Sequence, residues 1–318
     1  MLLICTRSLI VGIALFCSAV PLCVFGQSPT QDVDRARLLQ NQTRLQQDPY
    51  GEENGVADDG RATASPNDPD LGEQEILKRS QYYQPFTASV TTPFYYTSNV
   101  ALSRRNEQGD FLVAPAASFT YAPRITKTFF GEITIGQQMF YYDRFSELDF
   151  GSFDVRIGAA YYLPQLHNLT LHAQYVFNRL TTDNFDEFFT NHSLFFNAEL
   201  PFRIGRAQQV TFGADADFSI YANEDAPQRH EFDLYVGYAV NLTRSLSVDA
   251  VGRIYLRDYV NVDRTDVSEL LAVSATYRFT KWFSAGVVST FGSSQSNQSI
   301  FDYNIANIGG SVTFAVKF

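Results

Sequence analysis

Cysteine is almost absent from the 318-residue sequence, and its three cysteines all lie within the first 23 residues, at Cys5, Cys17 and Cys23. That stretch also holds an apolar run over residues 9–20 and small residues near its end, which is typical of a secretory signal peptide. We expect cleavage after Gly26, so residues 1–26 form the signal peptide. The exported chain then has no cysteine, which excludes disulfides and thiolate metal sites.

Long apolar runs are also missing. After the first segment, no stretch approaches the roughly 20 apolar residues that a membrane-spanning helix needs, and the mean hydropathy is −0.15. Tryptophan occurs once, yet there are 28 phenylalanines and 18 tyrosines, and aromatic residues favour strands. These features exclude a helical membrane protein, but they are compatible with a barrel whose strands alternate apolar and polar residues.

Recognisable motifs for chemistry are absent as well. The sequence has no phosphate-binding loop, dinucleotide fingerprint, zinc-ligand spacing or kinase motif. The net charge is −10 and the basic residues are dispersed, which argues against a nucleic-acid surface. We therefore expect no cofactor, no metal site and no nucleic-acid partner.

Residues 27–80 are rich in Gln, Asn, Asp, Pro and Gly and contain few aromatics. Such a composition buries too little apolar surface to offset the entropy of ordering, and it predicts a disordered periplasmic extension. Within it, residues 32–47 have loosely helix-spaced apolar positions. Two interpretations are open: a solvated tether, or a helix that plugs the protein or binds a periplasmic partner.

From Phe86 onward the apolar residues recur at every second position, as in Val210, Phe212, Ala214 and Ala216. Successive strand residues point to opposite faces, so each run has one apolar and one polar or small face. Most runs have the roughly nine to eleven residues that a tilted membrane strand needs. We count twelve runs, which begin near Phe86, Phe111, Thr128, Gly151, Leu169, His192, Gln209, Glu231, Leu246, Ser268, Phe283 and Asn304.

The connections between these runs alternate between short and long, and charge is sorted between them. The short turns carry basic residues, whereas the long connections, including residues 181–190 and 258–267, hold most of the acids. Bacterial barrels have short periplasmic turns and longer extracellular loops. With an even strand number, this pattern predicts that both termini lie in the periplasm.

The final run places Val312, Phe314, Val316 and Phe318 on one face and ends on an aromatic residue. It resembles the C-terminal assembly signal of Gram-negative outer-membrane β-barrel proteins. The resemblance covers the last strand alone, and it implies recognition by the barrel assembly machinery. Residues 81–318 are thus expected to form an all-β, transmembrane, antiparallel up-and-down β-barrel of about twelve strands, surrounded by the lipid of the bacterial outer membrane.

The alternation assigns a set of charged residues to the barrel interior. Charges facing hydrocarbon are costly, so these groups must be paired or wet. They line either a closed network of acid–base pairs or an aqueous channel that selects permeants. The predicted lumen-lining residues are Glu132, Asp154, Arg156, His172, Glu199, Asp215, Asp217, Glu231, Asp233, Asp249, Arg253, Arg257, Glu269, Arg278 and Lys317.

These features predict a passive pore for ions or small hydrophilic solutes, with a weak cation preference because acids outnumber bases in the lumen set. A non-conducting structural or surface-interaction barrel is the alternative. An outer-membrane hydrolase is a more distant one. Catalysis needs a nucleophile beside a base, but His192 and Ser193 are neighbours on one strand and point to opposite faces. We therefore expect no enzyme activity.

Overall fold

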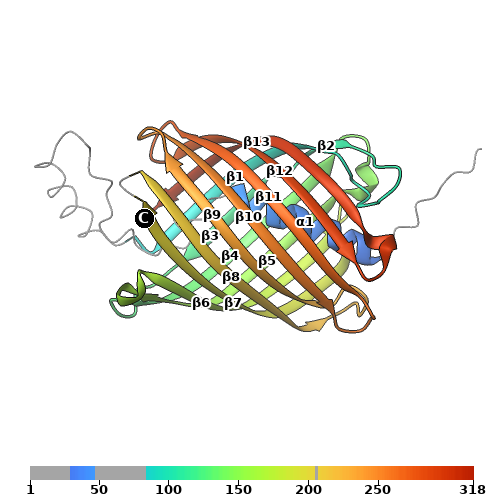
Figure 1. Cartoon of the computed structure of the whole chain (residues 1–318), viewed down its shortest axis with the longest axis horizontal. Helices are drawn as coiled ribbons and strands as arrows, with labels where there is room; N and C mark the ends of the chain where they lie inside the picture. The colour runs from blue at the N-terminus through green and yellow to red at the C-terminus, as the bar shows by residue number, and fades with distance from the viewer. Residues whose placement is uncertain (1–28, 47–83, 205–206) are drawn as a thin grey trace, which may run out of the picture.

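The protein is a closed antiparallel β-barrel (Figure 1). The computed structural model describes residues 29–46, 84–204 and 207–318, so the predicted signal peptide lies outside the described residues. Apart from β2 and β3, neighbouring strands in the chain pair with each other, and the last returns to the first. The strands are β1 (Phe86–Thr97), β2 (Asp110–Val113), β3 (Ala116–Tyr121), β4 (Phe129–Tyr142), β5 (Phe150–Leu163), β6 (Leu169–Thr182), β7 (Glu187–Ile204), β8 (Gln208–Ala222), β9 (Arg229–Asn241), β10 (Leu246–Tyr259), β11 (Thr265–Arg278), β12 (Phe283–Ser296) and β13 (Tyr303–Lys317).

The short strands β2 and β3 share one position in the barrel, because both pair with β1 on one side and β4 on the other. The interruption falls at Pro115, which has no backbone N–H to donate. Flanking bonds span it: Ala114 N–H donates to the carbonyl of Pro93 at 2.9 Å, and Met139 N–H donates to that of Pro115 at 3.0 Å. The barrel therefore has twelve strands, as the alternation predicts.

Side chains alternate between the lumen and the outer surface along every strand. In β4, Phe130 and Glu132 are buried toward the lumen, whereas Ile133 and Ile135 are exposed on the outside. Exposed aliphatic and aromatic residues recur on the outer face of the other strands, as a lipid-facing surface requires. This arrangement confirms the face assignment expected from the period of two.

The two ends of the barrel differ in their connections. Among the described residues, the short-turn end is formed by residues 122–128, 164–168, 242–245 and 279–282, and the long-loop end by residues 98–109, 143–149, 183–186, 223–228, 260–264 and 297–302. Two of the long connections are shorter than expected, because Thr181 still pairs with Glu187 and Asp258 with Thr265. Those strands continue past the positions where the sequence suggests a loop.

One α-helix, α1 (Pro29–Gln46), lies inside the barrel (Figure 1). Of the two interpretations of this segment, the plugging helix is the one observed. The predicted disordered extension is wrong for residues 29–46, because the lumen buries Val33, Ala36 and Leu39. The rest of the segment 27–80 lies outside the described residues. Within the described ranges, no helix is long and apolar enough to span a membrane.

Three short 3₁₀ turns complete the described elements: η1 (Ser146–Leu148), η2 (Pro164–Leu166) and η3 (Ser299–Phe301). The turn after η2 contains His167 and Asn168, both with positive φ angles of 54° and 65°. Consecutive left-handed residues of this kind match the right-handed twist of a tight hairpin. This geometry sets the register between β5 and β6, which places Asp154 opposite Asn178 in the lumen.

Candidate functional site in the barrel lumen

Fourteen of the fifteen predicted lumen-lining residues lie on the lumen face of their strands. Arg278 and Lys317 are at the short-turn end, where both are exposed. Lys317 is in register with Thr87, which is buried toward the lumen. The other twelve lie between the two ends: Glu132, Asp154, Arg156, His172, Glu199, Asp215, Asp217, Glu231, Asp233, Asp249, Arg253 and Arg257.

Glu269 is the exception, and its assignment to the lumen is wrong. It is exposed on the outer face of β11, directly opposite the exposed Ile254 of β10. The cause is the apolar pair that follows it, which breaks the alternation and makes the face ambiguous. Leu270 is 6% exposed in the lumen, whereas Leu271 is 49% exposed outside. Asp266 and Ser268, which share the strand face of Leu270, point inward.

The lumen wall has two halves of different chemistry. All twelve charged or histidine residues named above lie on the seven consecutive strands β4 to β10. On β12, β13, β1 and β3, the lumen face carries hydroxyl and amide groups and, apart from Lys317, no charged side chain. The hydroxyls of Thr91 and Thr313 lie 2.8 Å apart across β1 and β13. The wall is therefore wettable all around, but its charge lies on β4 to β11, apart from the inward-facing Asp110 of β2 and Lys317 of β13.

Acids and bases on the charged half are intermixed. Arg253 of β10 forms ion pairs with Asp233 of β9 and, at 3.5 Å, with Asp215 of β8. Its guanidinium also lies over the ring of Tyr235, 4.4 Å from the centroid. The Tyr235 hydroxyl donates to Glu199 Oε2 at 3.0 Å. Four adjacent strands thus share one polar network, and the acidic and basic sectors that would produce a strong transverse field are not separated.

A glycine makes room for this network. Gly213 of β8 faces Tyr235 of β9 in the sheet, and a Cβ atom on Gly213 would lie only 1.9 Å from the Tyr235 ring. The ring occupies the space where a side chain at position 213 would lie, which is how an aromatic side chain covers a strand glycine. The glycine is therefore required for the position of the Tyr235 hydroxyl beside Glu199.

The histidines do not form a catalytic arrangement. His172 Nδ1 lies 3.1 Å from Glu132 Oε2, and Gln174 donates to the same oxygen at 2.7 Å. His192 faces outward among aromatic rings, while the adjacent Ser193 is buried in the lumen. The expectation that these two neighbours point to opposite faces is confirmed. Among the described residues, no group of His, Cys, Asp or Glu has the arrangement to hold a metal ion.

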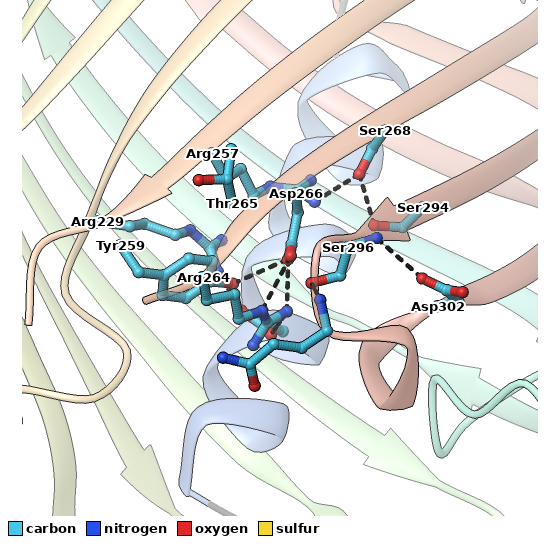
Figure 2. Close-up of polar contacts among 12 residues, drawn as sticks. Arg229, Arg257, Tyr259, Arg264, Thr265, Asp266, Ser268, Ser294, Ser296 and Asp302 are labelled. Atoms are coloured by element: carbon cyan, nitrogen blue, oxygen red, sulfur yellow. Dashed lines mark hydrogen bonds and ion pairs between the residues drawn. The ribbon is translucent and has the colours of Figure 1, made fainter. Parts of the chain in front are cut away.

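The helix α1 is held in the long-loop half of the lumen by polar contacts. Asp34 binds Arg229, the first residue of β9, and, at 3.0 Å, Arg264 of the loop after β10. The Tyr259 hydroxyl, at the end of β10, donates to Asp34 Oδ1 at 3.0 Å. Figure 2 shows Arg229, Tyr259, Arg264 and Asp266 gathered beside the helix. Arg229, Tyr259 and Arg264 thus all contact the carboxylate of Asp34.

Further contacts fix the helix one and two turns along. Arg37 Nη1 pairs with Glu231 Oε1 at 3.0 Å, and Gln40 bonds the hydroxyl of Ser152 on β5. On another side, Leu38 packs with Leu102 of the first long loop, in a cluster that includes Tyr303 and Ile305. An α-helix with side chains is about 10–12 Å across, so α1 fills much of the long-loop half.

Sequence reasoning missed several residues of this arrangement. Asp34 and Arg37 are three positions apart and share a helix face, a spacing that pairs charges with a common wall. Arg229 continues the alternation of Glu231 and Asp233, but that strand was expected to begin two residues later. Arg264 lies in an expected loop, where nothing in the local pattern indicates burial.

The four residues of the predicted assembly signal, Val312, Phe314, Val316 and Phe318, share the outer face of the closing strand. Phe318 exchanges two backbone hydrogen bonds with Phe86, each 3.0 Å long, and so seals β13 to β1. The Phe314 ring stacks on that of Phe283 of β12 at 4.8 Å. Their role in assembly stays a prediction.

Comparisons with known proteins agree on the fold. No protein-family model and no curated protein matches the sequence. The COG4313 outer membrane channel from Pseudomonas putida superimposes with a TM-score of 0.53 at 11% identity, over 73% of this chain and 96% of that chain. A KdgM porin gives 0.40 at 7% identity, over 71% and 98% of the two chains.

The translocator domain of the autotransporter NalP from Neisseria meningitidis has a TM-score of 0.46 and 11% identity, and the match covers 91% of this chain and 99% of that domain. At these identities the similarity concerns the fold alone. The match to the Pseudomonas putida channel, the strand closure, the outward apolar face and the polar lumen together identify the architecture. The chain has the closed twelve-stranded fold of the outer-membrane β-barrel proteins.

Proposed function

We propose that this chain is an outer-membrane channel for ions or small hydrophilic solutes, and that α1 keeps the channel closed in the conformation described above. The observation that carries the proposal is the helix held against a polar lumen wall by Asp34 and Arg37. Barrels of about eight strands are filled by their own side chains, and those of 16–18 leave an aqueous channel. A twelve-stranded barrel falls between these limits, so a helix is enough to occlude it.

The chemistry of the wall supports a path for water rather than a solid core. Buried ion pairs contribute little to stability compared with well-packed apolar residues. A barrel selected for rigidity alone would gain more from apolar side chains at Asp215, Asp233 and Arg253. The wall instead keeps charged groups along one half and hydroxyl and amide groups along the other, which suits polar solutes.

The test is conductance in planar bilayers with the full chain and with a double variant, Asp34→Arg plus Arg37→Glu. Reversing both charges places like charges beside Arg229 and Glu231, so α1 should leave the lumen. We expect small or rare current steps for the native chain and frequent steps, with a cation preference, for the variant. Trypsin cleavage after Arg35, which is buried while α1 is docked, reports the release of the helix independently of current.

The main competing function is a non-conducting barrel that contacts surface partners. The filled long-loop half of the lumen is the observation that favours it. The same experiment separates the two: release of α1, seen by trypsin, with no current would overturn the channel proposal. Deleting residues 183–186 should, in contrast, affect a surface partner alone.

The remaining expectations follow from this proposal. We place the short-turn end in the periplasm, which puts the start of β1 and the C-terminal strand there. The position of the N-terminus and a periplasmic contact through residues 27–80 stay predictions, because residues 1–28 and 47–83 lie outside the described residues. The proposal includes no enzyme activity, since His172 is engaged by Glu132 and His192 faces outward.

A further inference from the structure

Two arginines and a tyrosine converge on a single carboxylate at the long-loop mouth of the lumen. Arg229 and the hydroxyl of Tyr259 bind Asp34 Oδ1, and Arg264 binds Oδ2 at 3.0 Å. Both oxygens are therefore contacted, by groups from β9, β10 and the loop after β10. We call Arg229, Tyr259 and Arg264 the arginine cradle.

The arginine cradle is held in place by the wall and not by α1. Arg229 Nε donates to Glu231 at 2.6 Å, and Arg264 Nε donates to Asp266 at 3.0 Å. The ring of Tyr259 lies under both guanidinium groups, 5.4 and 4.2 Å from their centres. With α1 in place, Arg229 and Arg264 are each only 3% exposed. Preorganised, desolvated donors of this kind are what a specific binding site needs.

The wall around the arginine cradle carries more positive than negative charge. Arg229, Arg264 and the neighbouring Arg257 face two acids of the wall, Glu231 and Asp266, and without Asp34 one positive charge is left over. Two further N–H donors, Arg264 Nη1 and Arg257 Nε, are buried and have no hydrogen-bond partner among the described residues. A buried cation without a counter-charge is costly. When α1 leaves, the site that Asp34 occupied therefore favours an anion with several acceptor oxygens.

We propose that the arginine cradle is a binding site for the carboxylate group of a small solute, and that Asp34 of α1 occupies this site while the channel is closed. Planar guanidinium groups match the geometry of a carboxylate, and such charge-assisted hydrogen bonds are the strong ones. The inference rests on the proposed function, because a solute reaches the cradle only after α1 has left. Solute and helix then compete for the same donors, which links arrival of the solute to opening.

The test uses acetate, which reproduces the side chain of Asp34, as the probe, with acetamide as its uncharged counterpart. Saturation-transfer NMR on the full-length Asp34→Ala variant in detergent measures binding directly. We expect an acetate signal several-fold stronger than that of acetamide, and stronger than acetate gives with the native chain, whose cradle is filled. Equal signals for acetate and acetamide would overturn the proposal.

Matched variants locate the binding. Asp32→Ala removes a carboxylate of the same helix that pairs with Arg35, so it should leave the cradle occupied and give no acetate signal. Adding Arg264→Gln to Asp34→Ala should abolish the signal. Adding Tyr259→Phe, a milder change, should weaken acetate binding by about tenfold, because one hydrogen bond to a charged group is lost. Unchanged binding in both double variants would show that acetate binds elsewhere.

The outcomes also separate this inference from the channel proposal. Acetate binding to the Asp34→Ala variant without current through the charge-reversed barrel would leave the site standing and remove the channel. Current through the charge-reversed barrel without acetate binding to the Asp34→Ala variant would leave the channel standing and remove the carboxylate site.

Discussion

Arg37 of α1, inside the lumen, and Glu231 of the wall strand β9 form an ion pair, with Nη1 and Oε1 3.0 Å apart. The two residues are 194 positions apart in the chain, and both side chains are largely buried. The same Glu231 oxygen accepts from Arg229 at 2.6 Å. One carboxylate therefore joins the helix to the wall, beside the position where Asp34 binds.

Reversing the charge of Arg37 should release the helix. Arg37→Glu places a carboxylate against Glu231, and breaking a buried pair by changing one partner costs about 3–5 kcal/mol. We expect trypsin to cleave after Arg35 much faster in this variant than in the native chain. Gln31→Glu, which adds the same charge to the helix near its start, is the control and should cleave slowly. Equal protection of Arg35 in Arg37→Glu would show that the Asp34 contacts and apolar packing hold α1 without the Arg37–Glu231 pair.

Adding a methyl group to Gly213 should disturb the polar network. Gly213→Ala pushes the Tyr235 ring away from β8, which breaks the hydrogen bond to Glu199, and such overpacking costs about 1–3 kcal/mol. The measurement is the thermal unfolding midpoint in detergent. Gly252→Ala is a matched control, because a Cβ at Gly252 meets nothing within 4 Å. A similar loss in both variants would mean that strand propensity, and not the Tyr235 ring, causes the effect.

Asp149 gives the 143–149 loop a pH dependence. Burial raises the pKa of its carboxyl, and the negative charges of Asp183, Glu147 and Asp110 raise it further, although the Tyr142 N–H that it accepts at 2.7 Å acts in the opposite direction. Because the pKa in the folded state is above its ordinary value of 3.8, the charged form destabilises the loop. That cost is present above the raised pKa and disappears as the pH falls below 3.8.

Asp149→Asn keeps the Oδ1 acceptor for Tyr142 but removes the charge. We expect greater protection of the Tyr142 amide from hydrogen exchange in the Asn variant than in the native chain at about pH 7, where the carboxyl is charged. The difference should vanish at acidic pH, where both side chains are neutral. A variant that is less protected at neutral pH would contradict the raised pKa.

The outward position of Glu269 has a consequence for selectivity. In the charge-reversed background that releases α1, Asp249→Asn should reduce the cation-over-anion permeability ratio by about twofold, because Asp249 faces the lumen. Glu269→Gln removes the same charge from β11 and should leave the ratio unchanged. Reversal potentials in asymmetric salt measure both. A change with Glu269→Gln and none with Asp249→Asn would invert the assignment of faces.

The sequence alone determined the strand pattern. The period of two is local, because each residue's face depends only on its immediate neighbours along the strand, and so twelve strands and fourteen of fifteen lumen positions could be predicted. It also predicted the closing strand that ends at Phe318. It failed at Glu269, where two consecutive leucines remove the local signal.

Only the tertiary structure decided what the lumen contains. Whether Arg253 pairs with Asp215 and Asp233 depends on the register between strands, which sequence does not display. The place of α1 depends on closure of the barrel around it, since Asp34 finds Arg229 and Arg264 only once β9 and β10 are side by side. A polar segment with few apolar residues cannot fold alone, so its helix owes its position to contacts nearly 200 residues away in the chain.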